Sequence, residues 1–162
     1  MAHAEGEATI ASGNMSHAEG CETEASGNMS HAEGYKTKTY GATSHAEGYE
    51  TKAYERAHAE GRSSIAEGEG SHAEGYYTHA IGEYSHTEGN NTQTLAEYSH
   101  AEGNNTIAKG INSHAEGKGT IASGESQHVQ GRYNIEDAEN RFAHIVGNGE
   151  SQAPSNMHTL DW

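Results

Sequence analysis

The stretch SHAEGNNTIAKGIN, residues 99–112, is one unit of the repeat that decides the fold of this chain. A Ser-His-Ala-Glu-Gly phrase or a close variant recurs ten times, and every step between its histidines is 14 residues except one of 13. The phrase histidines are His3, His17, His31, His45, His58, His72, His86, His100, His114 and His128. A fixed period of this kind indicates one structural unit stacked on copies of itself.

The phrase alternates small and large residues. Ser16, Ala18 and Gly20 are small, whereas His17 and Glu19 between them are large and polar. Because a period of two is typical of a β-strand, we expect the small side chains to face a narrow interior and the His and Glu side chains to point outward. The glycine near the strand end is expected to suit a sharp corner.

A second, looser phrase follows seven residues later, as at residues 9–13, 106–110 and 120–124. Two strands of about five residues and two corners of about two would fill each unit, and neighbouring units would pair at roughly 4.8 Å. The sequence therefore predicts an all-β parallel solenoid, a rod about 43 Å long over nine steps. Helical repeats and coiled coils have other periods.

The single 13-residue step lies between His45 and His58. One residue and the expected glycine are missing near Glu55, Arg56 and Ala57. We expect a corner to absorb the deletion, so that the repeat resumes in phase at His58.

The composition by itself is typical of a disordered chain. The net charge is -15, and Val, Ile, Leu and Phe together supply 13 of 162 residues. The repeat overrules that interpretation, but an interior of Ala, Ser and Gly buries little apolar surface. We therefore expect a lone chain to be marginally stable and the protein to form an oligomer.

The charge balance also bears on partners. Lys and Arg number nine, too few for the basic face that phosphate binding requires, so no nucleic-acid partner is expected. No apolar stretch reaches membrane-spanning length, so no membrane insertion is expected. Met1 runs directly into the first repeat, which indicates a chain made without a signal peptide or a fragment. The single Cys21 rules out an intrachain disulfide.

Each phrase places a His and a Glu two residues apart on one outward face, and stacking would line them into ladders. The structural ladder is predicted at His17, Glu19, His31, Glu33, His45, Glu47, His58, Glu60, His72, Glu74, His86, Glu88, His100, Glu102, His114 and Glu116. Interleaved His side chains would relieve repulsion among the Glu side chains, and this pairing is expected to raise the pKa of the histidines.

Metal binding and nucleophilic catalysis are two other chemistries open to these residue types. Three His side chains around a threefold axis would be competent ligands for a divalent ion, but tenfold repetition is typical of architecture rather than of a built metal site. Ser16 and His17 point to opposite faces and cannot form a nucleophile and base pair. We therefore expect no catalytic residue, metal or cofactor.

Tyrosines fall at or near the corners. The candidates for binding a sugar or a protein are Tyr35, Tyr49, Tyr76, Tyr77, Tyr84 and Tyr98. The alternative interpretation, which we favour, is that these rings only cover the corner backbone.

Residues 1–131 resemble the heads of trimeric autotransporter adhesins, whose small-x-Ala-x-Gly strand also recurs every 14 residues. The resemblance implies a left-handed parallel β-roll and a homotrimer. In that family the large strand residues are often Val and Ile and contribute to the trimer interface, whereas here they are His and Glu.

Residues 132–162 leave the repeat and form a second, C-terminal segment. The strings AHIVGNG (143–149) and SNMHTLDW (155–162) are similar to the segment that follows SHAEG repeats in tail and neck-appendage minor structural proteins of phages infecting Gram-positive bacteria, at the start of a self-cleaving peptidase and chaperone region. We expect the register to stop at Gly131. The apolar residues Phe142, Ile145, Val146, Leu160 and Trp162 are expected to cap the rod or connect three chains.

These resemblances imply a structural rod or head segment of a trimeric phage tail fibre or appendage in the virion. A receptor-facing position is compatible with this role, and its partner would be a host cell-surface glycan or protein. The alternative is the head of a bacterial trimeric adhesin at the cell surface. A third is the remnant of a protein that contains an autoprocessing peptidase.

Overall fold

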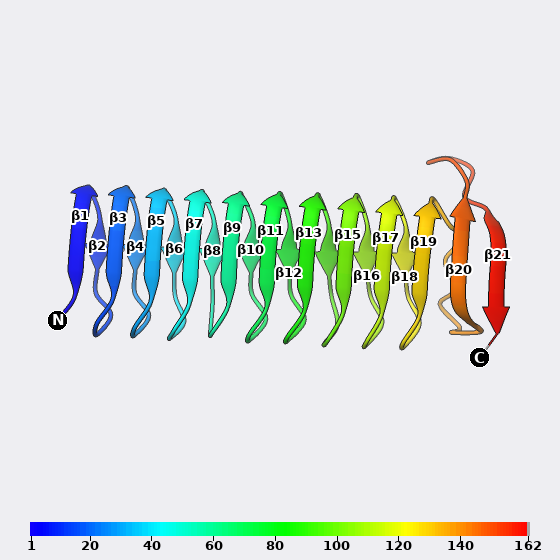
Figure 1. Cartoon of the computed structure of the whole chain (residues 1–162), viewed down its shortest axis with the longest axis horizontal. Coiled ribbons are helices and arrows are strands. Elements are labelled where there is room, and N and C mark those ends of the chain that lie inside the picture. The colour runs from blue at the N-terminus through cyan, green and yellow to red at the C-terminus, as the bar shows by residue number, and fades with distance from the viewer. Residues whose placement is uncertain (162) are drawn as a thin grey trace.

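The computed structural model describes residues 1–161, and within that range it contains strands but no helix. The strands form two parallel layers that run the length of the molecule, with long strands in one layer and short strands behind them (Figure 1). The predicted all-β solenoid with 14-residue turns is confirmed. No helix in the described part of the chain is of a length and apolarity that could cross a membrane.

The long layer contains β1 (His3–Glu7), β3 (His17–Cys21), β5 (His31–Tyr35), β7 (His45–Tyr49), β9 (His58–Arg62), β11 (His72–Tyr76), β13 (His86–Asn90), β15 (His100–Asn104), β17 (His114–Lys118), β19 (His128–Arg132), β20 (Phe142–Asn148) and β21 (Asn156–Asp161). The short layer contains β2 (Ile10–Ala11), β4 (Glu24–Ala25), β6 (Lys38–Thr39), β8 (Lys52–Ala53), β10 (Ile65–Ala66), β12 (His79–Ala80), β14 (Gln93–Thr94), β16 (Ile107–Ala108) and β18 (Ile121–Ala122).

Equivalent residues of successive turns pair with one another. His17 lies opposite His31, and Glu19 lies opposite Glu33. The 13-residue step keeps this register, because His45 lies opposite His58 and the missing residue is lost from the corner before β9. The expectation about the deletion is therefore confirmed.

The second strand of each turn is two residues long, shorter than the five that we expected. The backbone N–H groups of Ser12 and Gly13 both donate to the carbonyl oxygen of Ala25, at 3.0 and 3.2 Å. Since two successive donors share one acceptor, the ladder ends there and the chain turns.

The interior contains small side chains, as predicted. From the second turn on, Ala18, Ala32 and their equivalents are fully buried, and buried Ser and Thr side chains fill the rest of the core. Several buried serines satisfy their hydroxyl groups locally, as Ser30 Oγ donates to the Gly27 carbonyl oxygen at 2.7 Å. The narrow coil therefore requires small residues.

The glycine of the phrase is required by stacking more than by a corner. Gly20 has φ of +117°, and a Cβ there would collide with the backbone of Gly34 in the next turn. The corners themselves use non-glycine residues in the left-handed region, such as Glu22 and Lys36, both with φ of +56°. Our expectation that glycine forms the corners is therefore wrong at most turns.

The solenoid continues past Gly131, where we expected its register to stop. In β20, His144 and Gly147 lie opposite His128 and Gly131, so AHIVGNG supplies a further rung of the long layer. β21 then pairs with β20 in the antiparallel direction and ends the stack (Figure 1).

Part of the expected apolar cap packs at this end. Ile145 is fully buried and Phe142 packs against the same cluster. Leu160, however, is 49% exposed, because it lies on the outermost strand with no further layer over it. Trp162 lies outside the described residues.

Candidate functional surfaces

The histidines of the long strands form one continuous column of stacked rings. Ring centroids of neighbouring turns lie between 4.6 and 5.0 Å apart from His3 to His144. The rings of His58 and His72 are 4.7 Å apart and within 1° of parallel. In-register pairing therefore stacks His on His, instead of interleaving His with Glu.

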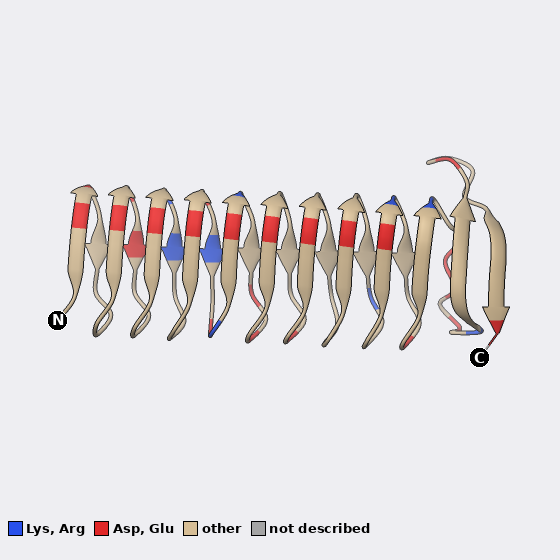
Figure 2. Cartoon of the chain, in the orientation of Figure 1, with Lys and Arg blue, Asp and Glu red and all other residues tan. Residues whose placement is uncertain are grey.

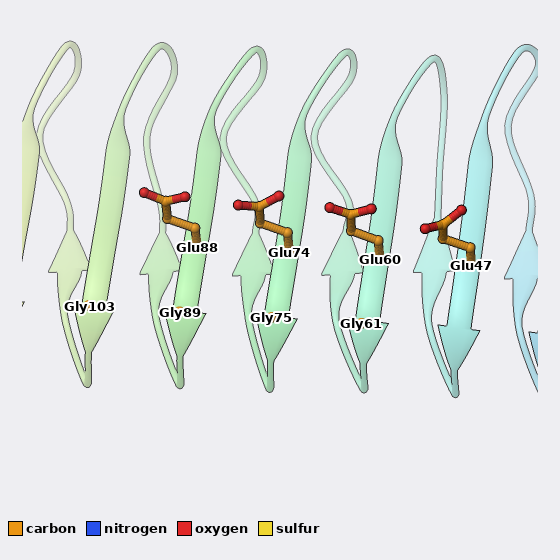
Figure 3. A pocket seen from close by; sticks show the side chains of 8 residues that line it. All are labelled: Glu47, Glu60, Gly61, Glu74, Gly75, Glu88, Gly89 and Gly103. Carbon is orange, nitrogen blue, oxygen red and sulfur yellow. The ribbon is translucent and has the colours of Figure 1, made fainter.

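The Glu side chains form a second column beside the rings, visible as a red band across the long strands in Figure 2. A groove runs along this column, lined by Glu47, Glu60, Glu74 and Glu88 and by the neighbouring glycines (Figure 3). The groove exists because the glycine row carries no side chains. The predicted ladder residues are thus brought together, as two adjacent columns.

The carboxyl groups of this column share protons. Hydrogen bonds to Glu60 and Glu88 raise the pKa of Glu74 to about 7, and burial adds to the effect. A hydrogen bond to Glu88 likewise raises the pKa of Glu102 to about 7. The same hydrogen bonds lower the pKa of Glu60 and Glu88. Raised and lowered pKa values therefore alternate from Glu60 to Glu102, which favours a smaller negative charge on this part of the column near neutral pH.

The pKa of five histidines shifts opposite to our expectation, namely His31, His72, His100, His114 and His144. Burial lowers the pKa of His72, and the neighbouring His86 and His58 lower it further. The same causes, burial first, lower the pKa of His100. The nearby carboxylates act in the opposite direction but are the weaker influence, because each imidazole is stacked between two others. Burial and stacking therefore favour the neutral imidazole at His72 and His100.

Contacts between the two columns change partner along the rod. In the first half, Nε2 approaches the Glu of the same strand, as in His31–Glu33 at 3.3 Å. In the second half it approaches the Glu of the preceding turn, as in His128–Glu116 at 3.1 Å. Both kinds of pair are about a third exposed or more, so each contributes little to stability.

Mixed His and Glu clusters are present in the second half of the column. In one of them, ligand atoms of His72, Glu74 and His86 lie within 4.8 Å of one another. A zinc ion holds its ligands at about 2.0–2.2 Å, which places any two of them at most about 4.4 Å apart. The His72 Nε2 and Glu74 Oε2 atoms are 3.8 Å apart, within that range, and the expectation of no metal stays a prediction.

The interior and exterior faces separate Ser16 from His17 as predicted. Ser16 is buried and its hydroxyl donates to the Gly13 carbonyl oxygen at 2.7 Å, whereas the His17 side chain is 37% exposed. The two side chains therefore lie on opposite faces of the strand.

The six candidate tyrosines divide between two corners. Tyr35, Tyr49, Tyr76 and Tyr77 lie where the long strands end. We call this corner the basic corner and define it by residues 35–36, 49–50, 62–63 and 76–77 together with Lys38 and Lys52, which begin the short strands that follow. Tyr84 and Tyr98 lie at the opposite corner, which follows the short strands. Sequence order alone does not reveal this division.

The opposite corner is acidic. We call it the acidic corner and define it by Glu55, Glu69, Glu83, Glu97, Tyr84 and Tyr98. Stacking is tight there, because the Tyr84 N–H donates to the Glu69 carbonyl oxygen at 2.8 Å. The rings of Tyr84 and Tyr98 stack at 5.6 Å, and the Tyr84 hydroxyl donates to a Glu69 carboxylate oxygen at 3.3 Å.

Sequence reasoning missed the cations of the basic corner. Lys36 and Lys38 belong to one turn, Lys52 to the next and Arg62 to the one after, and the four side chains gather over these three successive turns. Aligning the sequence in rows of 14 would have revealed the cluster, because it places these positions in adjacent columns.

Comparisons with protein-family models and with curated proteins find no match for this chain.

Proposed function

We propose that this protein is a non-enzymatic structural rod of a trimeric phage tail fibre or appendage. The observation that carries the proposal is the unbroken register of the long layer from β1 to β20, in which every turn repeats the same backbone contacts. Such a stack supplies length and stiffness, because each turn is fixed by its neighbours along its whole perimeter.

The trimeric, left-handed β-roll form of the proposal rests on the resemblance to adhesin heads and on the size of the core. Among the described residues, two buried apolar side chains are larger than Thr. They are Val129 and Ile145, and both lie near the C-terminal end. Since a core of Ala, Ser and Thr gives little hydrophobic stabilisation, association of copies would supply what a single chain lacks.

Two measurements test this proposal. Light scattering of the purified chain is expected to give a mass near three times that of one chain, and a stable monomer would contradict the trimer. Antibodies raised against the chain are expected to label phage tails or appendages in immunogold microscopy. Labelling of bacterial cell surfaces in place of virions would favour the adhesin-head alternative.

A further inference from the structure

The basic corner carries a ridge of stacked aromatic and cationic side chains. Tyr35 and Tyr49 stack at 5.0 Å, and the Arg62 guanidinium lies over Tyr49 and Tyr76 at 5.1 and 5.5 Å. Tyr77 meets Tyr76 edge-on at 4.4 Å. The ridge therefore spans four successive turns with its rings already held in place.

A groove runs beside this ridge. It is lined by Lys36, Lys38, Glu50, Lys52, Ser63, Ile65 and Tyr77. The lining comes from the corner row and from the first residues of the short strands, and the blue segments at β6 and β8 in Figure 2 mark two of its lysines. At about 4.8 Å per turn, the groove extends about 14 Å along the rod.

The groove and ridge together are a local excess of positive charge on an acidic rod. Lys36, Lys38, Lys52 and Arg62 oppose a single carboxylate within the lining, Glu50. Lys36 and Lys38 are half-exposed and pair with Glu22 and Glu24 of the preceding turn at 3.7 and 3.3 Å. Such surface pairs are weak and exchangeable.

The other two cations have no such partner. Within residues 1–161, neither Lys52 nor Arg62 forms an ion pair with a carboxylate. Arg62 presents a guanidinium held between two rings, and an ordered guanidinium binds planar anions with little loss of entropy. Lys52 adds an ammonium group that is free to reach a second anionic group.

We propose that the basic corner binds an acidic oligosaccharide. Tyrosine rings combine an apolar body with a hydroxyl group, which matches the mixed C–H and O–H surface of a sugar. Arg62 and Lys52 would hold carboxylate, sulfate or phosphate substituents. A nucleic acid fits less well, because its dense charge would meet the net charge of -15 carried by the chain.

Binding of the intact protein to an array of oligosaccharides tests this inference. The array carries neutral sugars and their uronic acid, sulfate and phosphate counterparts, so that the anion is identified by which arm responds. We expect binding to at least one acidic series and not to its neutral counterpart, with weakening at high salt. Binding to no acidic sugar, or equal binding to neutral ones, would overturn the proposal.

Matched variants locate the site. Arg62→Gln is expected to weaken binding at least tenfold, whereas Arg56→Gln removes the same charge near the acidic corner and is expected to change it less than twofold. Tyr77→Ala and Tyr98→Ala form a second matched pair. Both tyrosines have a left-handed backbone conformation, and both are about half exposed. Only Tyr77→Ala should weaken binding, and equal effects of the two members of either pair would refute the assignment.

The proposal is independent of the rod function. Thermal melting and light scattering of each variant show whether the rod itself is intact, and they are expected to be unchanged by Arg62→Gln. A correctly assembled rod that binds no acidic sugar would contradict the binding site and leave the structural proposal standing.

Discussion

At the scale of single residues, left-handed corners are a source of strain that this chain tolerates at many turns. Thr43 has φ of +55°, although a β-branched residue is disfavoured in that region, and the equivalent position two turns later is Gly70. The chain thus already contains the residue type that would relieve the strain.

We predict that Thr43→Gly stabilises the protein. Removing the left-handed penalty is worth about 1–2 kcal/mol, and the greater freedom of glycine in the unfolded chain returns about half of it. The net gain is expected to be about 1 kcal/mol, measured by denaturant unfolding. Thr43→Ala keeps the strain and serves as the control, so equal stabilisation by both variants would refute the explanation.

The phrase glycines have the opposite sensitivity. A Cβ on Gly89 would collide with the carbonyl oxygen of Gly103, and φ there is +104°. We predict that Gly89→Ala costs more than about 3 kcal/mol, or prevents folding, because backbone must move in both turns.

The control for that substitution is Gly70→Ala. Its Cβ would meet the ring of Tyr84, a side chain at the exposed surface, instead of the backbone of the next turn. The cost is expected to be about 1–2 kcal/mol, the left-handed penalty alone. Similar unfolding midpoints for the two variants would show that stacking does not select the phrase glycine.

At the scale of elements, Glu and His side chains of the long layer contribute to stability over opposite pH ranges. The raised pKa of Glu74 and Glu102 gives a contribution to stability that is complete below pH 4.5 and is lost as pH rises through about 7. The lowered pKa of His72 and His100 gives a contribution to stability that is complete above pH 6.5. This contribution is lost as pH falls through the pKa of the folded state.

This separation predicts the behaviour of Glu74→Gln combined with Glu102→Gln. Gln keeps a donor for the neighbouring carboxylates but cannot ionise, so the variant should melt higher than the wild type at pH 8 and equally at pH 4. Thermal melts across that range measure the difference. Glu7→Gln, at an exposed position on β1, is the control, and a matching gain in that variant would contradict the shared-proton explanation.

At the scale of the whole molecule, the two ends of the rod differ. β1 is an open edge, and its interior residue Ala4 is exposed. At the other end, β20 adds a turn to the long layer and β21 pairs with its edge. Asp137 is almost fully buried there and accepts hydrogen bonds from the Phe142 N–H at 2.8 Å and from Gln127 Nε2 at 3.2 Å. The C-terminal segment therefore closes the stack.

Removing residues 132–162 is predicted to cause aggregation. The truncation exposes β19 as an edge together with the interior face around Val129, which is fully buried in the whole chain. Removing residues 1–14 is the matched control, because it shortens the rod by one turn and leaves an edge like the one already present. Sedimentation should show large species for the first truncation alone, and soluble behaviour of both would contradict the capping role.

The sequence by itself determined the period, the all-β solenoid, the small-residue interior and the tolerance of the 13-residue step. The reason is that alternating small and large residues place the small side chains on one face of each strand. Because the same alternation recurs in every turn, each turn makes the same contacts with its neighbours. The alternation of Ser16 and His17 between faces follows from the same rule.

Only the tertiary structure decided how the stacked side chains affect one another, and with that the chemistry of the surface. Burial, together with the stacking of imidazole on imidazole, lowered the pKa of His72 against our expectation, and the stacking of carboxyl on carboxyl raised the pKa of Glu74. It also joined Tyr49 to Arg62 and separated them from Tyr84. Each of these contacts joins residues about one period apart. The few residues that flank a side chain in the sequence do not identify its partner in the next turn.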